Sequence, residues 1–304
     1  MNPKISVIVP VYNTSLYLDD CLKSATQPGD VEIICVDDAS TDNSIDILNK
    51  WANKDERIIV LKHDTNKGLS ATRNTALEKA RGDYILFLDS DDMFKDNIYR
   101  VVLMNMRDID ALWFNAASNM NQKWWYVSAI YPPKISGREM FTKSKIDYKF
   151  REPTQLWAIR RSFLNDIGLK FHEGIYFEDE LFTVSMLMKA KSVSHIKDIL
   201  YFYRRRPNSI TTKKDNAHKK FKSLVTIISE YMDTIYTDEP EPLKRAILMH
   251  MSFLLNMMKY HSKKVSRERM TEYEKELLYL ADCCPDWMQN NQIERYIHNR
   301  LESK

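Results

Sequence analysis

The chain has 304 residues, of which 44% are hydrophobic and 29% charged, and its net charge is +3. This length and apolar content suit one large globular domain or two ordinary ones, and the small net charge argues against a nucleic-acid-binding protein. The four cysteines lack paired spacing and the N-terminal residues lack a signal-peptide pattern, so we expect a reducing, intracellular setting; no run of about 20 apolar residues predicts a membrane span.

Short β-forming runs alternate with helix-like segments in the first hundred residues. The expected strands are residues 5–11, 31–36, 58–61 and 84–88, and the expected helices are residues 16–26, 41–52 and 69–80. We expect Ser40 to cap the second helix and Gly82 to end the third. This rhythm predicts an α/β fold with a mostly parallel sheet flanked by helices.

The composition changes near residue 210. Residues 110–206 are mixed and rich in aromatic clusters, whereas residues from 215 onward are rich in Met and Leu at helical spacing. We therefore expect a catalytic domain over residues 1–210 and a helical region over residues 211–304. Packing on the first domain is the default role for these helices. A homodimer interface, or contact with an anionic membrane through Lys263, Lys264, Arg267 and Arg269, stays open as an alternative.

The expected strands end in polar residues, which matters because ligands bind at the carboxyl ends of parallel strands. The run YILFLDSDDMF (84–94) places three carboxylates in four positions directly after an apolar strand. A plain turn or helix cap is one explanation, and a site for a divalent cation is the other, because such a cation offsets the mutual repulsion. The chain has neither GxGxxG nor GxxxxGK[ST], which argues against a glycine-rich phosphate loop.

Seven motifs occur in a fixed order along the chain. They are SVIVPVYN (6–13), VDDASTDNS (36–44), NKGLSATRNTAL (66–77), LDSDD (88–92), WAIRRSFL (157–164), YFEDELF (176–182) and LYFYRRRPNSIT (200–211). Together they resemble the family-2 glycosyltransferases, which have the GT-A nucleotide-sugar-binding fold. The resemblance covers about the first two thirds of the chain and is closest to the enzymes that build bacterial surface glycans.

The resemblance implies a donor site at the strand ends. It assigns the direct metal contact to Asp91 and a place near the metal and the ribose to Asp89. For Asp92 we expect a structural role instead, as the cap of a helix that starts near Met93. The residues implied to bind the nucleotide sugar are Pro10, Tyr12, Asn13, Asp38, Asn66, Arg73, Asp89, Ser90, Arg204 and Arg206. Structural alternatives remain for several of them: an Asx turn for Asp38, a turn for Asn66, an exposed helix cation for Arg73 and a basic surface turn for the arginines.

The resemblance also implies an acid–base site at Glu178 and Asp179. Asp179 is the expected base that takes the proton of the acceptor hydroxyl, and a solvated acidic turn before a helix is the alternative. Some relatives place a histidine in the arginine segment as a further metal ligand, and this chain has none between His195 and His218. We expect His172 and His195 to be structural, and Trp157 to stack on a sugar or to belong to the core.

These implications combine into one expected function. The chain would be a metal-dependent inverting glycosyltransferase that uses Mn2+ or Mg2+ and a nucleotide diphosphate sugar, most often a UDP-sugar. Its acceptor would be a hydroxyl of a glycan or lipid-linked molecule in capsule, lipooligosaccharide or O-antigen synthesis, in the cytoplasm at the inner face of the bacterial inner membrane. The alternatives are a non-catalytic sugar-nucleotide-binding protein and a sugar nucleotidyltransferase, which usually carries a glycine-rich phosphate loop that PVYNTSLYL lacks.

Overall fold

The structure is a computed structural model that describes residues 3–119, 127–205, 216–235 and 239–266. The chain divides into two compact units. The first contains Met1–Gly174 and Phe182–Pro207, and the second contains Ile175–Leu181 and Asn208–Lys304.

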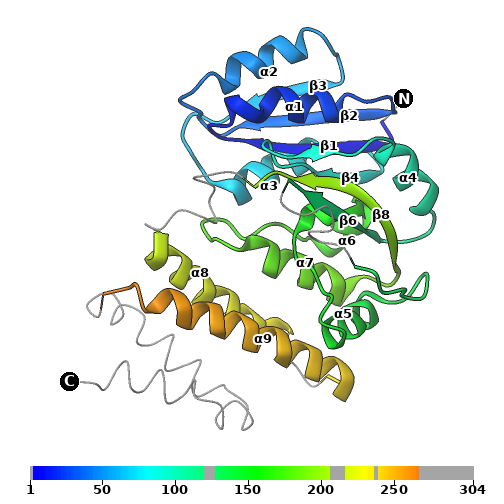
Figure 1. Cartoon of the computed structure of the whole chain (residues 1–304), viewed down its shortest axis with the longest axis vertical. Helices are drawn as coiled ribbons and strands as arrows, with labels where there is room; N and C mark the ends of the chain where they lie inside the picture. Colours follow the sequence, from blue (N-terminus) through cyan, green and yellow to red (C-terminus); the bar gives the residue numbers. More distant parts are fainter. Residues whose placement is uncertain (1–2, 120–126, 206–215, 236–238, 267–304) are drawn as a thin grey trace. The chain divides into compact units, whose positions relative to one another are not determined.

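The first unit is built on a sheet whose parallel half comes from the start of the chain (Figure 1). Its strands are β1 (Ile5–Val11), β2 (Val31–Asp37), β3 (Ile58–Lys62) and β4 (Tyr84–Phe87), and β1 pairs in parallel with both β2 and β4. Every residue of β1 and β2 is buried, because helices cover both faces of the sheet and continuous Val and Ile runs suit that setting.

The other half of the sheet begins beside β4, where the strand direction reverses. There β7 (Trp157–Arg160) pairs antiparallel with β4, and the remaining strands are β6 (Ala111–Ser118), β8 (Val193–Tyr203) and β5 (Met93–Phe94). Among the described residues the sheet has eight strands in the order β3-β2-β1-β4-β7-β6-β8-β5. Strand β4, which the DSDD motif follows, therefore lies at the junction of the two halves of the sheet.

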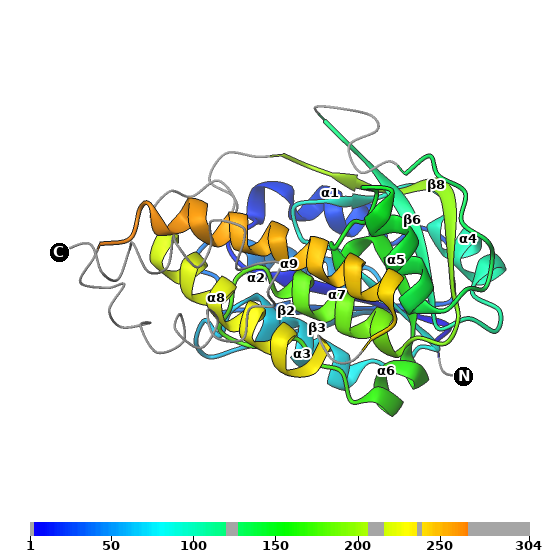
Figure 2. The same cartoon turned by 90° about the horizontal axis from the view of Figure 1, so that it is seen from below.

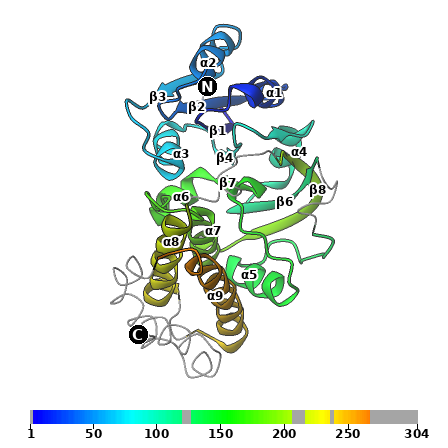
Figure 3. The ribbon, with the colours of Figure 1, turned by 60° about the vertical axis from the view of Figure 1, so that its left-hand side comes forward.

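Helices connect the strands of the first unit. They are α1 (Ser15–Ala25), α2 (Ser44–Ala52), α3 (Leu69–Lys79), α4 (Ile98–Asn105), α5 (Gly137–Ile146), η1 (Thr154–Leu156) and α6 (Arg161–Ile167). Figures 2 and 3 show α1 and α3 on opposite faces of β1 and β2. In α1 the buried residues Leu18, Cys21, Leu22 and Ala25 follow the three- and four-residue spacing of a helix face.

The second unit joins the segment Ile175–Leu181, in which α7 (Glu178–Lys189) begins, to C-terminal helices. These helices are α8 (Ala217–Glu230), the π-helical turn η3 (Tyr231–Ile235) and α9 (Glu241–Ser262), and α8 and α9 lie side by side (Figure 2). In the part of the chain that the structure describes, none of the helices is long and apolar enough to cross a membrane.

Two expected helix caps are wrong. The residue that precedes α2 is Asn43, and Ser40 instead accepts a hydrogen bond through Oγ from the Asn13 N–H at 3.1 Å. Helix α3 ends at Lys79, and the next residue, Ala80, has an extended backbone conformation. Gly82 therefore does not terminate the helix. Gly82 is small for another reason: a Cβ there would lie 2.5 Å from the backbone nitrogen of Ser6 on β1.

The close approach of Gly82 to β1 belongs to a buried hydrogen-bond network around Glu32. Its carboxylate accepts from the Ser6 hydroxyl and from the Arg81 backbone N–H, both at 2.6 Å, and lies 2.9 Å from the Arg81 guanidinium. Burial raises the pKa of Glu32, but the hydrogen bonds from Ser6 and Arg81 outweigh burial and hold that pKa below its usual value. The network ties β1, β2 and the start of β4 together at their amino ends.

We expect Glu32→Gln to lower the free energy of unfolding by about 2 kcal/mol at pH 7, because the buried donors lose a charged acceptor. A carboxyl whose pKa is lowered by folding contributes stability above its unfolded pKa of about 4.3, and this contribution is lost as the pH falls through the folded pKa. Urea unfolding from pH 7 down to pH 3 should therefore show the gap between wild type and variant closing in acid.

The matched control is Asp83→Asn, which removes the exposed Lys4–Asp83 ion pair of 2.9 Å and should leave the free energy of unfolding nearly unchanged. A Glu32→Gln deficit that is the same at every pH would contradict this account.

Candidate functional site

The DSDD motif forms a tight turn at the carboxyl end of β4. The strand pairing continues to Leu88, whose N–H donates to the Ile8 carbonyl at 2.9 Å, and the turn closes when the Asp92 N–H donates to the Asp89 carbonyl at 2.9 Å. Asp89 and Asp91 are partly exposed, whereas Asp92 is buried. The three carboxylates therefore stand in different surroundings.

Asp89 is held by two buried side chains from elsewhere in the first unit. Arg73 on α3 donates through Nη2 to Oδ1 at 3.0 Å, and Gln155 on η1 donates through Nε2 to Oδ2 at 2.5 Å. Arg73 is fully buried, with its guanidinium 5.1 Å from the centre of the Phe171 ring. Arg73 is thus a partner of the turn, which rules out the alternative of an exposed helix cation.

Asp92 does not cap a helix, so that expectation is wrong. Residues Met93–Phe94 form the short strand β5, and α4 begins only at Ile98. The Asp92 carboxylate instead accepts from the Tyr201 hydroxyl and from the Arg204 backbone N–H, each at 2.7 Å. Burial, followed by the charges of Asp91 and Asp89, raises the pKa of Asp92 well above its usual range.

The thiol of Cys21 on α1 contacts the turn, and the carboxylates of the turn contribute to raising its pKa. Its Sγ donates to the Asp89 carbonyl at 3.6 Å. Burial is the largest cause that raises the pKa of Cys21, and the charges of Cys35, Asp92, Asp91 and Asp89 raise it further. Cys21 thus packs directly against the DSDD turn.

The described residues offer only a small ligand set for a metal at this turn. Among residues 3–119, 127–205, 216–235 and 239–266, no group of three or more His, Cys, Asp or Glu side chains is arranged to hold a metal ion. Mg2+ is commonly bound by only one or two carboxylates together with phosphate oxygens and water. Asp91 and Asp89 fit that smaller ligand set.

The loop after β1 is connected to the same turn. Asn13 has a left-handed backbone (φ 52°), and its Oδ1 accepts from the Thr41 N–H at 2.8 Å. The next residue, Thr14, donates through its hydroxyl to Ser90 at 3.0 Å. Tyr12 is 47% exposed and Pro10 is buried within β1. The structure therefore brings the ends of β1 and β4 together through Thr14, which sequence reasoning missed.

Asp38, at the end of β2, organises the loop that follows β3. Its buried carboxylate accepts from the backbone N–H groups of Lys67 and Gly68, each at 2.8 Å, and pairs with His63 Nδ1 at 2.7 Å. Asn66 donates through Nδ2 to the Asp38 carbonyl at 3.3 Å. Asp38 and Asn66 thus lie together, and this carboxylate shapes the loop whatever it binds.

The arginine segment is described only in part. Arg204 donates through Nη2 to Asp20 Oδ2 at 2.9 Å, and its guanidinium lies 5.2 Å from the centre of the Tyr17 ring. Its backbone bond to Asp92 places it beside the DSDD turn. Arg206 lies outside the described residues.

Glu178 and Asp179 belong to the second unit, whereas the residues described above belong to the first. They occupy the first turn of α7 together with Glu180. Glu178 and Glu180 are 7% and 4% exposed and Asp179 is partly exposed, so the turn is not the solvated acidic turn of the alternative.

Trp157 belongs to the core and His195 packs against the core residue Trp113, as a structural role requires, whereas His172 is exposed. Trp157 is fully buried and stacks on Trp113, with ring centroids 5.5 Å apart, so it belongs to the core. His195 lies 4.7 Å from the Trp113 ring, and burial lowers its pKa to about 4, which keeps it neutral at pH 7. His172 is exposed and contacts the carbonyl of Glu173.

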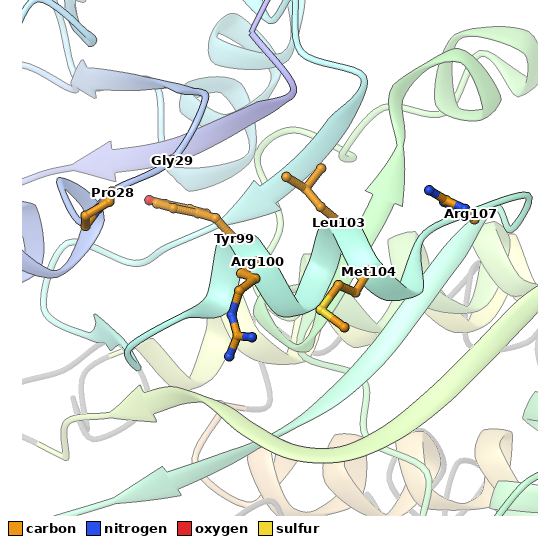
Figure 4. A pocket seen from close by; sticks show the side chains of 7 residues that line it. All are labelled: Pro28, Gly29, Tyr99, Arg100, Leu103, Met104 and Arg107. Carbon is orange, nitrogen blue, oxygen red and sulfur yellow. The ribbon is translucent and has the colours of Figure 1, made fainter.

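A surface hollow of about 570 Å3 lies elsewhere in the first unit (Figure 4). Tyr99 reaches from α4 toward Pro28 and Gly29, which precede β2, and the other lining residues are Arg100, Leu103, Met104 and Arg107. Because Gly29 leads into the amino end of β2, this hollow is separate from the carboxyl ends that carry the site.

Comparison with known proteins places this geometry in a family. The model of glycosyl transferase family 2 matches residues 6–168. The glycosyltransferase EpsJ of Bacillus subtilis is 30% identical over 252 residues, which cover 76% of this chain and 71% of EpsJ. A poly(ribitol-phosphate) beta-glucosyltransferase of Bacillus spizizenii is 33% identical over 234 residues, which cover 71% of this chain and 33% of that protein.

Solved structures give the same fold. A crystal structure of S. aureus TarS in complex with UDP-GlcNAc superposes with a TM-score of 0.72 at 21% identity, covering 98% of this chain and 87% of the TarS chain. The mixed sheet with flanking helices is thus the GT-A fold that the sequence predicts.

The different surroundings of Asp89 and Asp91 predict different effects on stability. Asp89→Asn removes an anionic partner of the fully buried Arg73 and should lower the free energy of unfolding by about 3 kcal/mol. Asp91→Asn removes one charge from the same turn and should change it by under about 1 kcal/mol. Urea unfolding with EDTA present measures both variants, and equal losses would contradict the assigned pairing of Asp89.

Proposed function

The chain belongs to glycosyl transferase family 2, and from that premise we propose that it transfers a sugar from a UDP-sugar to a hydroxyl of a glycan or lipid-linked acceptor, with inversion at the anomeric carbon. The observation that carries the proposal is the acidic turn at the end of β4, linked to the β1 loop and backed by buried donors. The fold shared with a UDP-GlcNAc complex supports a UDP-sugar as donor.

At the donor end, Asp91 together with Asp89 would hold Mn2+ or Mg2+, which when bound neutralises charge on the leaving diphosphate. Arg73 and Gln155 keep Asp89 oriented, since they occupy one oxygen each. The nucleoside would lie along the end of β1 and the loops after β1, β2 and β3, where the contacting residues would be Pro10, Tyr12, Asn13, Asp38 and Asn66. Ser90 belongs to the DSDD turn and Arg204 lies beside it; these two residues, together with Arg206, would contact the phosphates.

At the acceptor end, Asp179 would accept the proton of the attacking hydroxyl, with Glu178 beside it. The hydroxyl oxygen forms a bond to the anomeric carbon on the face opposite the diphosphate, the bond to the diphosphate breaks, and the configuration inverts in one displacement. The partial exposure of Asp179 between two buried acids supports its role, because a base must reach both solvent and substrate.

The acceptor is proposed from the relatives. One of them is named a poly(ribitol-phosphate) beta-glucosyltransferase, which supports a polymeric acceptor and, together with the sequence resemblance, a surface glycan as the product here. A cytoplasmic setting at the inner face of the bacterial membrane stays a prediction, as do membrane contact and a homodimer.

We expect the chain to release UDP from at least one UDP-sugar in the presence of Mn2+ or Mg2+. Asp179→Asn should lower kcat by at least about 100-fold and leave the affinity for UDP unchanged, since it removes the base and not the donor site. Asp91→Asn should instead abolish the metal dependence of UDP binding. Isothermal titration and a coupled UDP-release assay measure these effects.

The control is Glu78→Gln, an exposed acid paired with Lys170, which should retain wild-type kinetics. The panel includes GDP- and CMP-sugars as rival donors. The proposal fails if no sugar nucleotide is turned over, with or without metal, across a set of glycan acceptors.

A further inference from the structure

The segment that carries the candidate base belongs to the second unit. Residues Ile175–Leu181 group with the C-terminal helices and not with the sheet, although the chain enters and leaves this segment from the first unit. Three helical elements of the second unit, α8, η3 and α9, each contact it through a named side chain. These contacts are the basis of the inference.

One contact is a buried pair between Glu180 and His250. His250 Nε2 on α9 lies 3.1 Å from Glu180 Oε2, and the two side chains are 0% and 5% exposed. A carboxylate so far from solvent is costly unless polar groups lie near it, and the imidazole nitrogen lies within ion-pair distance. The Glu180 side chain therefore lies against α9, one residue after Asp179.

Tyr231 adds a second contact to the same residue. Its buried hydroxyl donates to the Glu180 carbonyl at 2.8 Å, and its ring centre lies 5.4 Å from that of His250. Side chain and backbone of Glu180 are thus both held, by two neighbouring residues of η3 and α9.

The start of the segment is held as well. The Tyr176 N–H donates to Ser223 Oγ on α8 at 2.9 Å, and the Phe177 ring lies 6.0 Å from His261 on α9. Phe177 has a left-handed backbone (φ 63°), which is unfavourable for a residue with a Cβ. Such a conformation persists where surrounding contacts impose it, and these helices supply such contacts.

We propose that Tyr231 and His250 are positioning residues for the transfer reaction: by fixing Glu180 they fix the first turn of α7, and with it the direction in which Asp179 points. Successive helix residues are about 100° apart around the axis, so a turn held at Glu180 sets the orientation of Asp179. The first turn of a helix frays readily without tertiary contacts, which gives the two residues their effect. The inference rests on the proposed role of Asp179 as base.

The test uses Tyr231→Phe, which removes one oxygen and keeps the ring, and His250→Gln. We expect kcat for UDP release to fall by about 10- to 100-fold in each variant, because a small misplacement of the base slows proton transfer. The dissociation constant for UDP should stay at the wild-type value, since the proposed donor residues lie in the first unit. A merely structural role would lower donor binding together with kcat.

A double-mutant cycle sharpens the test. In an Asp179→Asn background, adding Tyr231→Phe should leave the residual rate unchanged, because Tyr231 acts through a base that is already absent. A further fall of tenfold or more in that background would overturn the proposal, as would wild-type kcat in both single variants.

Two control variants match the chemistry. Tyr260→Phe removes an exposed tyrosine hydroxyl from α9, and His218→Gln changes a partly exposed histidine on α8; both should retain wild-type kcat. Thermal unfolding shows whether His250→Gln folds, and Tyr231→Phe decides the question if it does not. A wild-type protein that turns over no sugar nucleotide refutes the proposed function, whereas an active wild type with unaffected variants refutes only the positioning role.

Discussion

Repulsion among the three carboxylates at the end of β4 is the constraint on which the site depends. The structure offsets it by giving the acids different partners: Arg73 and Gln155 hold Asp89, while Tyr201 and the Arg204 backbone hold Asp92. These donors come from α3, η1, β8 and the residue after β8, so the turn recruits parts of the chain from both halves of the sheet. The hydrogen bonds to this acidic cluster thereby connect distant parts of the first unit to one another.

The first hundred residues could be predicted well because their pattern is local. Buried parallel strands need continuous Val and Ile runs, and the helices between them show helical spacing, so β1 to β4 and α1 to α3 fall within a few residues of expectation. The errors lie at the ends. Ser40 and Gly82 looked like caps, but their roles are set by contacts with Asn13 and Ser6 from other parts of the sheet. The two-residue strand β5 depends on pairing with β8, and no local signal marks it.

The residues of the candidate site likewise fall into those that local sequence motifs indicated and those that distant contacts bring together. The ordered motifs pointed to the carboxylates, and Thr14 lay next to a motif residue. Nothing in the sequence indicated Gln155, and the last motif contained Tyr201 without indicating its contact with Asp92. Gln155 is 66 residues from Asp89, and Tyr201 is 109 residues from Asp92. Such pairs are brought together by strand order, which single-residue patterns do not encode. The sequence did not indicate that Ile175–Leu181 groups with the C-terminal helices, because this grouping also depends on contacts between distant residues. Holding this segment is a role for those helices that composition, which suggested packing, membrane or dimer contacts, did not indicate.

The strand order β3-β2-β1-β4 affects which substitutions the protein can accept during evolution. From β1 the chain runs outward through β2 to β3 and then returns to β4 on the other side of β1, so the loops after these two adjacent strands come from distant parts of the chain and meet at the Thr14–Ser90 hydrogen bond. The backbone path places these loops side by side, and their side chains determine what they contact. Substitutions in the loops can therefore alter the ligand while the Val and Ile core stays intact, which separates selection for binding from selection for folding.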